Sequence, residues 1–291
     1  MLDHSSNIIG KLISTLLVIL ALCCAQGAAF GQDELRRDVE YLSNPLLEGR
    51  GFHTRGLQNA AVYVLKSFQA SGLDTKVQPF VEGGLAGHNI IGIRHGNPQS
   101  DKYILVCAHY DTVLPSDGAF LPAADANASG VAAMLELSRK LPESGKNFIF
   151  AAFDGHTEGF AGAKAFLAEG KKISLVVNLD TMGSTLCPPS SYRPDFIIAL
   201  GGERYEKSLN AANRQPRLRL YFDYYGSRDF TRLFYRAMSD HVPFLQKGTS
   251  CVMFTSGITL NTNKAGDLPS TLDYPVFQRR VELIRNWLES L

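Results

Sequence analysis

The sequence has no excess of charge of either sign. It holds 29 Lys and Arg residues against 28 Asp and Glu residues, so its formal net charge is +1. This balance gives no reason to expect a nucleic acid or an anionic membrane surface as a partner. Hydrophobic residues make up 45% and charged residues 20% of the 291 residues. Such a composition is typical of a globular chain with a buried core and excludes disorder along most of its length.

The apolar run near the amino terminus is too short for a membrane-spanning helix, which needs about 20 residues. It covers residues 12–24 and is followed by small residues, a pattern typical of a signal peptide. We therefore predict a signal peptide over residues 1–31, cleaved near Gly27 or Gly31. The mature chain would have no transmembrane span and would be exported to a periplasmic or extracellular location. A lipoprotein anchor at Cys23 and an uncleaved anchor are the alternatives.

Cysteine is scarce. Of the five cysteines, Cys23 and Cys24 would leave with the signal peptide, and Cys107, Cys187 and Cys251 would remain. Three cysteines cannot all pair within one chain, and a domain of this size has enough core to fold without disulfides. Cys107 lies in an apolar run and is most simply interpreted as a small buried hydrophobic residue.

Several catalytic motifs are absent. No Gly-x-Ser-x-Gly turn is present, and Ser256 lacks the flanking glycines that a serine-hydrolase nucleophile has. No glycine-rich phosphate-binding loop is present either, since Gly201-Gly202 is better interpreted as a turn. No internal repeat or low-complexity tract interrupts the chain. The sequence therefore disfavours serine hydrolases and phosphate-loop enzymes.

Short apolar segments alternate with helical patterns along the chain. The hydrophobic periodicity predicts a helical region over residues 33–71, interrupted by a glycine-rich loop at 44–56, and further helices at 129–141, 162–168 and 274–291. It predicts strands at 75–81, 88–94, 103–108, 147–153, 174–179 and 196–200. This order indicates an α/β fold with a largely parallel sheet that is covered on both faces. We expect a single domain over residues 32–291.

Polar side chains follow several of the predicted strands. They form five segments: His109 to Asp111, Asp125 to Ser129, Asp154 to Glu158, Asp180 to Gly183, and Ser239 to His241. Open α/β sheets bind their ligands at the carboxyl ends of the strands. Any one of these segments alone could be a helix cap or a turn, but all five together predict a functional site at this edge of the sheet.

These segments, together with Leu47-Glu48-Gly49-Arg50-Gly51 and the stretch 266–274, resemble the co-catalytic zinc aminopeptidases. That family includes aminopeptidase Y, bacterial leucyl aminopeptidase and the glutaminyl cyclases. The resemblance covers nearly all of the chain after residue 31. It implies a three-layer α/β/α sandwich around a mixed, mostly parallel sheet.

The resemblance also implies which residues would bind metal. Family members hold two zinc ions through a His, a bridging Asp, a Glu, a second Asp and a second His, with a further Glu as general base. His109 falls on the first ligand position and Asp180 on the second Asp position. Asp111 would orient His109, and Asp125, on the first Asp of the family's loop, is a candidate further ligand.

Three of the five ligand positions carry other residues. Ala126 falls on the bridging position, Thr157 on the glutamate ligand and Asn263 on the last histidine, while His156 falls on the general base. A methyl group cannot bridge two cations, and a hydroxyl and an amide are poor zinc ligands. The resemblance therefore predicts at most one zinc ion, weakly bound.

Two hypotheses of different class follow. In the first, two-zinc catalysis has been lost and the chain is a secreted peptide-binding or scaffold protein. Asp240 and His241 would then line a cleft that receives the amino terminus of a peptide or protein. In the second, the chain is an active metallo-exopeptidase that cleaves amino-terminal residues. His109 and Asp180 would hold one metal with Asp125 or with His156, or His156 would act as the base.

Overall fold

The computed structural model describes residues 33–115, 119–143 and 145–291. The predicted signal peptide, residues 1–31, lies outside these residues, as does the alternative anchor site at Cys23. Across the described ranges, every helix is too short or too polar to cross a bilayer.

A mixed sheet forms the centre of the described part of the chain. Its eight strands are β1 (Asp74–Glu82), β2 (Leu85–Arg94), β3 (Lys102–His109), β4 (Asn147–Phe153), β5 (Lys172–Leu179), β6 (Phe196–Leu200), β7 (Arg219–Tyr221) and β8 (Cys251–Thr255). They are ordered β1-β2-β4-β3-β5-β8-β6-β7. The four central strands β4, β3, β5 and β8 run parallel, and antiparallel pairings join β2 to β4 and β6 to β8. The carboxyl ends of the four central strands therefore meet at one edge.

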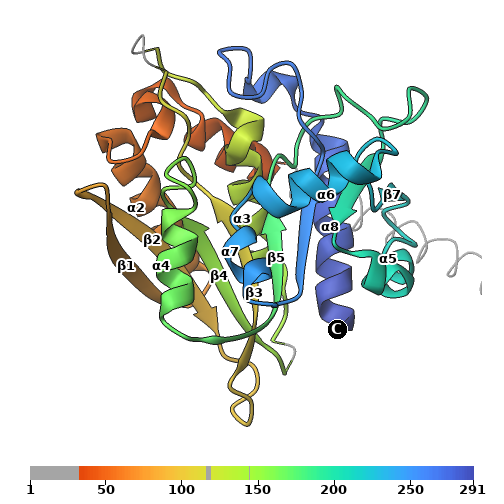
Figure 1. Ribbon diagram of the computed structural model, residues 1–291, viewed down its shortest axis with the longest axis horizontal. Coiled ribbons are helices and arrows are strands. Elements are labelled where there is room, and N and C mark those ends of the chain that lie inside the picture. Colours follow the sequence, from red (N-terminus) through yellow and green to blue (C-terminus); the bar gives the residue numbers. More distant parts are fainter. Residues whose placement is uncertain (1–32, 116–118, 144) are drawn as a thin grey trace, which may run out of the picture.

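Helices connect and cover these strands. They are a helix over residues 33–42, then η1 (Pro45–Arg50), α2 (Arg55–Ala70), η2 (Ala124–Ser129), α3 (Gly130–Lys140), α4 (Ala161–Ala168), η3 (Glu203–Tyr205), α5 (Glu206–Ala212), α6 (Arg228–Ala237), α7 (Val242–Gln246), η4 (Pro269–Thr271) and α8 (Tyr274–Ser290). Figure 1 shows these helices arranged on both sides of the sheet.

The alternation of side chains along the strands separates two hydrophobic layers. Val106 of β3 packs in the cluster that contains α2, α3 and α8, whereas its neighbour Leu105 packs in the cluster that contains α4 and α7. The predicted three-layer α/β/α sandwich with a mixed sheet is confirmed. No strand was predicted at Cys251–Thr255, although β8 lies inside the sheet between β5 and β6.

The cysteines of the described residues are unpaired. Cys107 and Cys251 are buried and Cys187 is half-buried, and all three are free thiols. The prediction that Cys107 is a buried residue is confirmed: it is fully enclosed, and its sulfur lies 3.4 Å from Asn178 Oδ1. Burial raises the pKa of the Cys107 thiol well above its usual range, so this group is inert at neutral pH.

Candidate active site at the carboxyl ends of the parallel strands

A pocket of about 110 Å³ lies at the carboxyl edge of the parallel strands. His109 ends β3, Asp180 directly follows β5, and His156 lies in the loop after β4. The apolar part of the wall comes from Val113, Phe234, Met238 and Ile258. The edge of the sheet that the sequence singled out therefore does carry a concave site.

His109 and Asp180 face each other across this pocket. The Nδ1 atom of His109 lies 3.0 Å from the backbone oxygen of Asp111, and its Nε2 atom lies 3.8 Å from Asp180 Oδ1. The Ser239 hydroxyl donates to Asp180 Oδ2 at 2.7 Å. Burial alone would raise the pKa of Asp180, but the nearby His109 and His156 rings and the Ser239 hydroxyl outweigh burial and hold the pKa at about 2. Asp180 is therefore a carboxylate at neutral pH.

His156 is paired with a buried acid. Its Nδ1 atom lies 2.7 Å from Asp240 Oδ2, and Asp240 is fully buried. The imidazole ring of His156 stacks on that of His109 with 3.7 Å between centroids. Burial acts to lower the pKa of His156, but the Asp240 carboxylate and its hydrogen bond, aided by Asp180, raise it to about 9. His156 therefore carries a proton on both ring nitrogens at neutral pH.

The Asp111 carboxylate does not orient His109 by a hydrogen bond of its own. The backbone oxygen of Asp111 is the hydrogen-bond partner of His109 Nδ1, and the nearest Asp111 carboxylate oxygen lies 3.7 Å from the same nitrogen. Instead, the two carboxylate oxygens accept from His156 N at 3.1 Å and from the Thr157 backbone at 3.2 Å and hydroxyl at 3.1 Å. Asp111 thus fixes the loop that carries His156.

The loop that carries the bridging position is firmly held. The two oxygens of Asp267 accept from the backbone N–H groups of Asp125 at 2.7 Å and of Ala126 at 3.0 Å. The Ala126 side chain lines the pocket and is 7% exposed. The position expected to bridge two metals is therefore in place, but it offers only a methyl group.

Asp125 lies outside the pocket. One carboxylate oxygen accepts from Gly183 N at 2.7 Å and from the Ser129 hydroxyl at 3.0 Å, and the other has no partner in the described structure. Burial and the nearby Asp267 raise the pKa of Asp125 to about 6. These contacts give Asp125 a structural role beneath the loop, so we do not assign it to a metal.

The other two replaced positions do line the pocket. The Thr157 hydroxyl is already used, because it donates to Asp111, and Asn263 is exposed at the rim. Asn127, which lies between Asp125 and Ser129, has a structural role: it is buried, and its Oδ1 atom accepts from the backbone of Gly130 at 3.1 Å and of Thr181 at 3.0 Å.

Asp240 and His241 point to different places. Asp240 lies behind His156, and neither of the two residues lines the pocket. His241 Nε2 lies 2.6 Å from the backbone oxygen of Tyr235, on a fully buried ring. Burial lowers the pKa of His241 to about 4, so the ring is neutral. We therefore do not assign His241 to the cleft. Asp240 influences the cleft only through its contact with His156.

The donor set does not fit a pair of zinc ions. The positions at which the resemblance expects the bridging carboxylate, the glutamate and the last histidine carry Ala126, Thr157 and Asn263. Among the described residues, one group of candidate ligands remains: atoms of His109, His156 and Asp240 lie within 4.8 Å of one another. Within that group, the 2.7 Å between His156 Nδ1 and Asp240 Oδ2 is a hydrogen-bond separation. A proton thus occupies the space between these two atoms.

Sequence reasoning missed the role of Asp267, which holds two backbone groups of the site loop. It lies in the stretch 266–274 that contributes to the family resemblance, but no local pattern indicates that its side chain holds the loop at 125–126. Asp154 belongs to one of the five predicted segments, but its carboxylate turns away from the pocket and accepts from His88 N at 2.9 Å. The position of Asp154 directly after β4 was a signal for a site residue but could not indicate which way its side chain points.

Comparison with known proteins identifies the family of the chain. Residues 89–288 match the family described as Peptidase family M28. The chain belongs to peptidase family M28. Within this family, Aminopeptidase YwaD of Bacillus subtilis is 31% identical over 179 residues, which cover 58% of this chain and 35% of that protein. The glutaminyl-peptide cyclotransferase of Drosophila melanogaster is 28% identical over 64% of this chain and 60% of its own length.

Solved structures share the fold. BSAP, a zinc aminopeptidase from Bacillus subtilis, superposes with a TM-score of 0.72 at 16% identity and covers 89% of this chain and 94% of its own. The glutaminyl cyclase of Porphyromonas gingivalis gives 0.69 at 17% identity, with 89% and 98% covered. The M28 chain described here therefore has the aminopeptidase fold, although its match spans only about a third of YwaD.

Proposed function

We propose that this M28 protein is exported, has lost two-zinc hydrolysis and binds the amino termini of peptides or proteins in its pocket. The observation that carries the proposal is Ala126. Its backbone is fixed at the bridging position by Asp267, yet its side chain has no atom that can bind a metal. A two-zinc centre here would lack the shared carboxylate. It would also lack the two further ligands that the resemblance expects at positions 157 and 263, where the chain has Thr157 and Asn263.

The state of His156 supports the loss of hydrolysis. A general base must be unprotonated before it can activate water, and its best pKa lies near the working pH. The pairing with Asp240 raises the pKa of His156 to about 9, so the ring is already protonated near pH 7. The positive charge of this ring lies among the carboxylates of Asp111, Asp180 and Asp240. It offsets part of the negative charge that metal ions would otherwise neutralise.

The pocket suits a peptide amino terminus. Asp180 offers a carboxylate that remains ionised to about pH 2, and an ammonium group would be its natural partner. Phe234, Met238 and Ile258 supply an apolar wall beside it, against which the first side chain of the peptide would pack.

A second candidate function is a one-metal exopeptidase. The close grouping of His109, His156 and Asp240 favours it, because three protein ligands are the usual set for a catalytic zinc. Metal binding there would require the proton between His156 and Asp240 to leave. Zinc affinity would then rise with pH.

Two measurements decide between these functions. The purified chain is assayed for bound metal by mass spectrometry and, with added Zn²⁺, for release of amino acids from aminoacyl chromogenic substrates. We expect no stoichiometric metal and no turnover. Zinc-dependent turnover that disappears in His109→Ala would overturn the proposal and establish the exopeptidase.

Peptide binding is tested separately by calorimetry. A peptide with a free amino terminus and the same peptide acetylated are titrated into the wild-type chain and into Asp180→Asn. We expect binding of the free peptide only, weakened by about tenfold or more in the variant, as for loss of a charge-assisted hydrogen bond. Equal binding of both peptides would contradict recognition of the amino terminus.

A further inference from the structure

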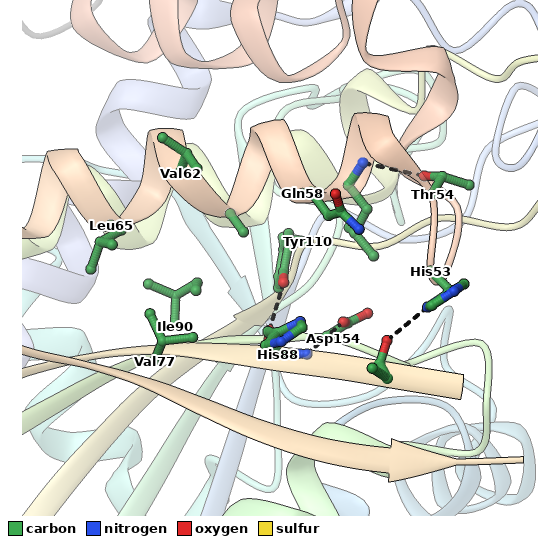
Figure 2. Close-up of a pocket in the computed structure, with 13 residues that line it drawn as sticks. His53, Thr54, Gln58, Val62, Leu65, Val77, His88, Ile90, Tyr110 and Asp154 are labelled. Atoms are coloured by element: carbon green, nitrogen blue, oxygen red, sulfur yellow. Dashed lines mark hydrogen bonds between the residues drawn. The ribbon is translucent and has the colours of Figure 1, made fainter. Parts of the chain in front are cut away.

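A second pocket lies between α2 and the strands β1 and β2, and it shares no lining residue with the candidate active site. Its volume is about 190 Å³. Figure 2 shows α2 along one side of it, the strands along the other, and Tyr110 between them. The Tyr110 hydroxyl donates to the backbone oxygen of His88 at 2.6 Å, which fixes the ring as part of the wall.

One end of this pocket is apolar. Val62 and Leu65 extend from α2, and they lie opposite Val77 of β1 and Ile90 of β2 (Figure 2). Val62 is 49% exposed, so this end opens to solvent. Covering apolar surface of this kind with a ligand of matching size is favourable for binding.

The other end is polar and contains a buried carboxyl group. Asp154 is 2% exposed, and its oxygens accept from the backbone of His88 at 2.9 Å and of Gly155 at 2.7 Å. Each carboxylate oxygen has a second lone pair, so the group can still accept from a ligand. No Lys or Arg lines the pocket. Burial and the nearby Asp111 raise the pKa of Asp154 to about 7, and a ligand that brings a positive charge would favour its ionised form.

Two histidines complete the polar end. The Nδ1 atom of His53 lies 3.1 Å from the backbone oxygen of Ala86, so the proton is on Nδ1 and Nε2 is an acceptor. The backbone groups of His88 are bonded, while its ring makes no hydrogen bond among the described residues. Both rings line the pocket beside Asp154 (Figure 2). Acceptors thus dominate this end, which favours a ligand that donates hydrogen bonds.

We propose that this pocket binds a small amphiphilic primary amine. Its phenyl ring or branched alkyl chain lies between α2 and the sheet, and its ammonium group donates to Asp154. The charge and the three donors of an ammonium group match the acceptors at the polar end. This site is separate from the proposed function, because it uses a different pocket and a different carboxylate.

The probe is 2-phenylethylamine, with 2-phenylethanol as the neutral control of the same shape. Calorimetry on the full chain should give saturable binding of the amine and much weaker binding of the alcohol. Asp154→Asn should weaken amine binding by about tenfold or more, because a hydrogen bond to a charged group is lost. Ala61→Phe, which fills the apolar end, should abolish it.

Two further variants locate the binding. Val81→Ala changes a residue of β1 that is 71% exposed and outside the pocket, and it should leave the affinity unchanged. Asp180→Asn alters the candidate active site and should also leave it unchanged, even if the proposed peptide binding there is abolished. Thermal unfolding checks that each variant is folded. If Asp154→Asn does not fold, the result for Ala61→Phe decides whether the amine binds in this pocket.

Three outcomes would overturn the proposal. One is the absence of saturable amine binding at millimolar concentration. Another is equal affinity for 2-phenylethanol, which would remove the role of Asp154. The third is amine binding that Asp180→Asn abolishes and Ala61→Phe leaves intact, which would move the ligand to the other pocket.

Discussion

At the scale of single residues, the side chain at position 126 governs what the site can hold. His109 and Asp180, the two ligands that the resemblance expects to be retained, both line the pocket, with 3.8 Å between Nε2 and Oδ1. Position 126 lines the same pocket, and its backbone is anchored. A carboxylate at this position would be the third protein ligand that a zinc ion with one open coordination site requires.

The variant Ala126→Asp should therefore gain a zinc ion. We expect one equivalent of bound zinc after metal loading and dialysis, measured by mass spectrometry, against none for the wild type. The matched control is Ala126→Asn, which has the same size but no anionic oxygen and should stay metal-free. Equal zinc content in the two variants would show that His109 and Asp180 are not aligned for a metal.

The pair of His156 and Asp240 predicts a pH-dependent stability in the metal-free protein. The pKa of His156 is raised from 6.5 to about 9, so its stabilising effect is complete below pH 6.5 and is lost as pH rises through about 9. The difference corresponds to at most roughly 3 kcal/mol. Urea unfolding at pH 6, 7.5 and 9 should show this loss in the wild type.

Asp240→Asn should be less stable than the wild type at pH 6, and the gap should close toward pH 9. Asp229→Asn, an exposed change on α6, serves as the control and should follow the wild-type profile. A constant gap between Asp240→Asn and the wild type at every pH would mean that His156 is not protonated in the folded state.

The residues of the site were predictable from the sequence, but their directions were not. His109, Asp180 and His156 meet in one pocket because the ends of neighbouring parallel strands meet at one edge. The adjacent Asp240 and His241 point into different surroundings, since one faces His156 and the other faces Tyr235. Which way a side chain points after a strand depends on tertiary packing that a single sequence does not encode locally.

At the scale of elements, the loop around η2 depends on a residue far along the chain. Asp267 accepts hydrogen bonds from the backbone of Asp125 and Ala126, and it is buried. The loop is further held by Asn127, which accepts from the backbone of Gly130 and Thr181. These bonds satisfy backbone groups that have no partner in the helix itself.

Asp267→Ala should lower the free energy of unfolding by about 2–5 kcal/mol, because it leaves two buried N–H groups without acceptors. Asp267→Asn keeps one acceptor oxygen and should lose about half as much. Urea denaturation measures both. If the alanine variant is as stable as the wild type, water replaces the carboxylate and the loop does not depend on it.

Elements with a strong apolar pattern were predicted and the others were not. The strand at Asn147–Phe153 is wholly buried, and its predicted bounds agree with the structure. β8 was not predicted, although it is buried and has five residues, like the predicted strand at 196–200; periodicity alone does not distinguish so short an apolar run from a buried helix turn. β7 has three partly exposed residues at the edge of the sheet. Such a segment becomes a strand only through its pairing with β6.

At the scale of the whole molecule, the helix over residues 33–42 is bound firmly to α3. Leu35, Val39 and Leu42 are fully buried in the main hydrophobic cluster. Asp38 is fully buried too, and its Oδ2 atom lies 2.5 Å from Arg139 Nη2 of α3. The first described helix is therefore part of the fold and not an appended arm.

A chain that starts at residue 44 should be less stable than one that starts at residue 32. Three buried apolar side chains, at about 1.5–3 kcal/mol each, predict a loss of roughly 5 kcal/mol or more in the free energy of unfolding. Glu40→Ala alters only an exposed ion pair on the same helix and should cost less than about 1 kcal/mol. Thermal and urea unfolding of the three proteins provide the test, and equal stability of both chain lengths would contradict it.

The attachment of this helix has a consequence for maturation. A predicted leader could be removed without harm only if the protease cuts upstream of Asp33, the first described residue of this helix. A cut further along would strip Leu35 and its neighbours from α3 and expose the surface that they cover. The position of this helix therefore sets the latest residue at which a shortened form of the chain can start and still keep this part of its core.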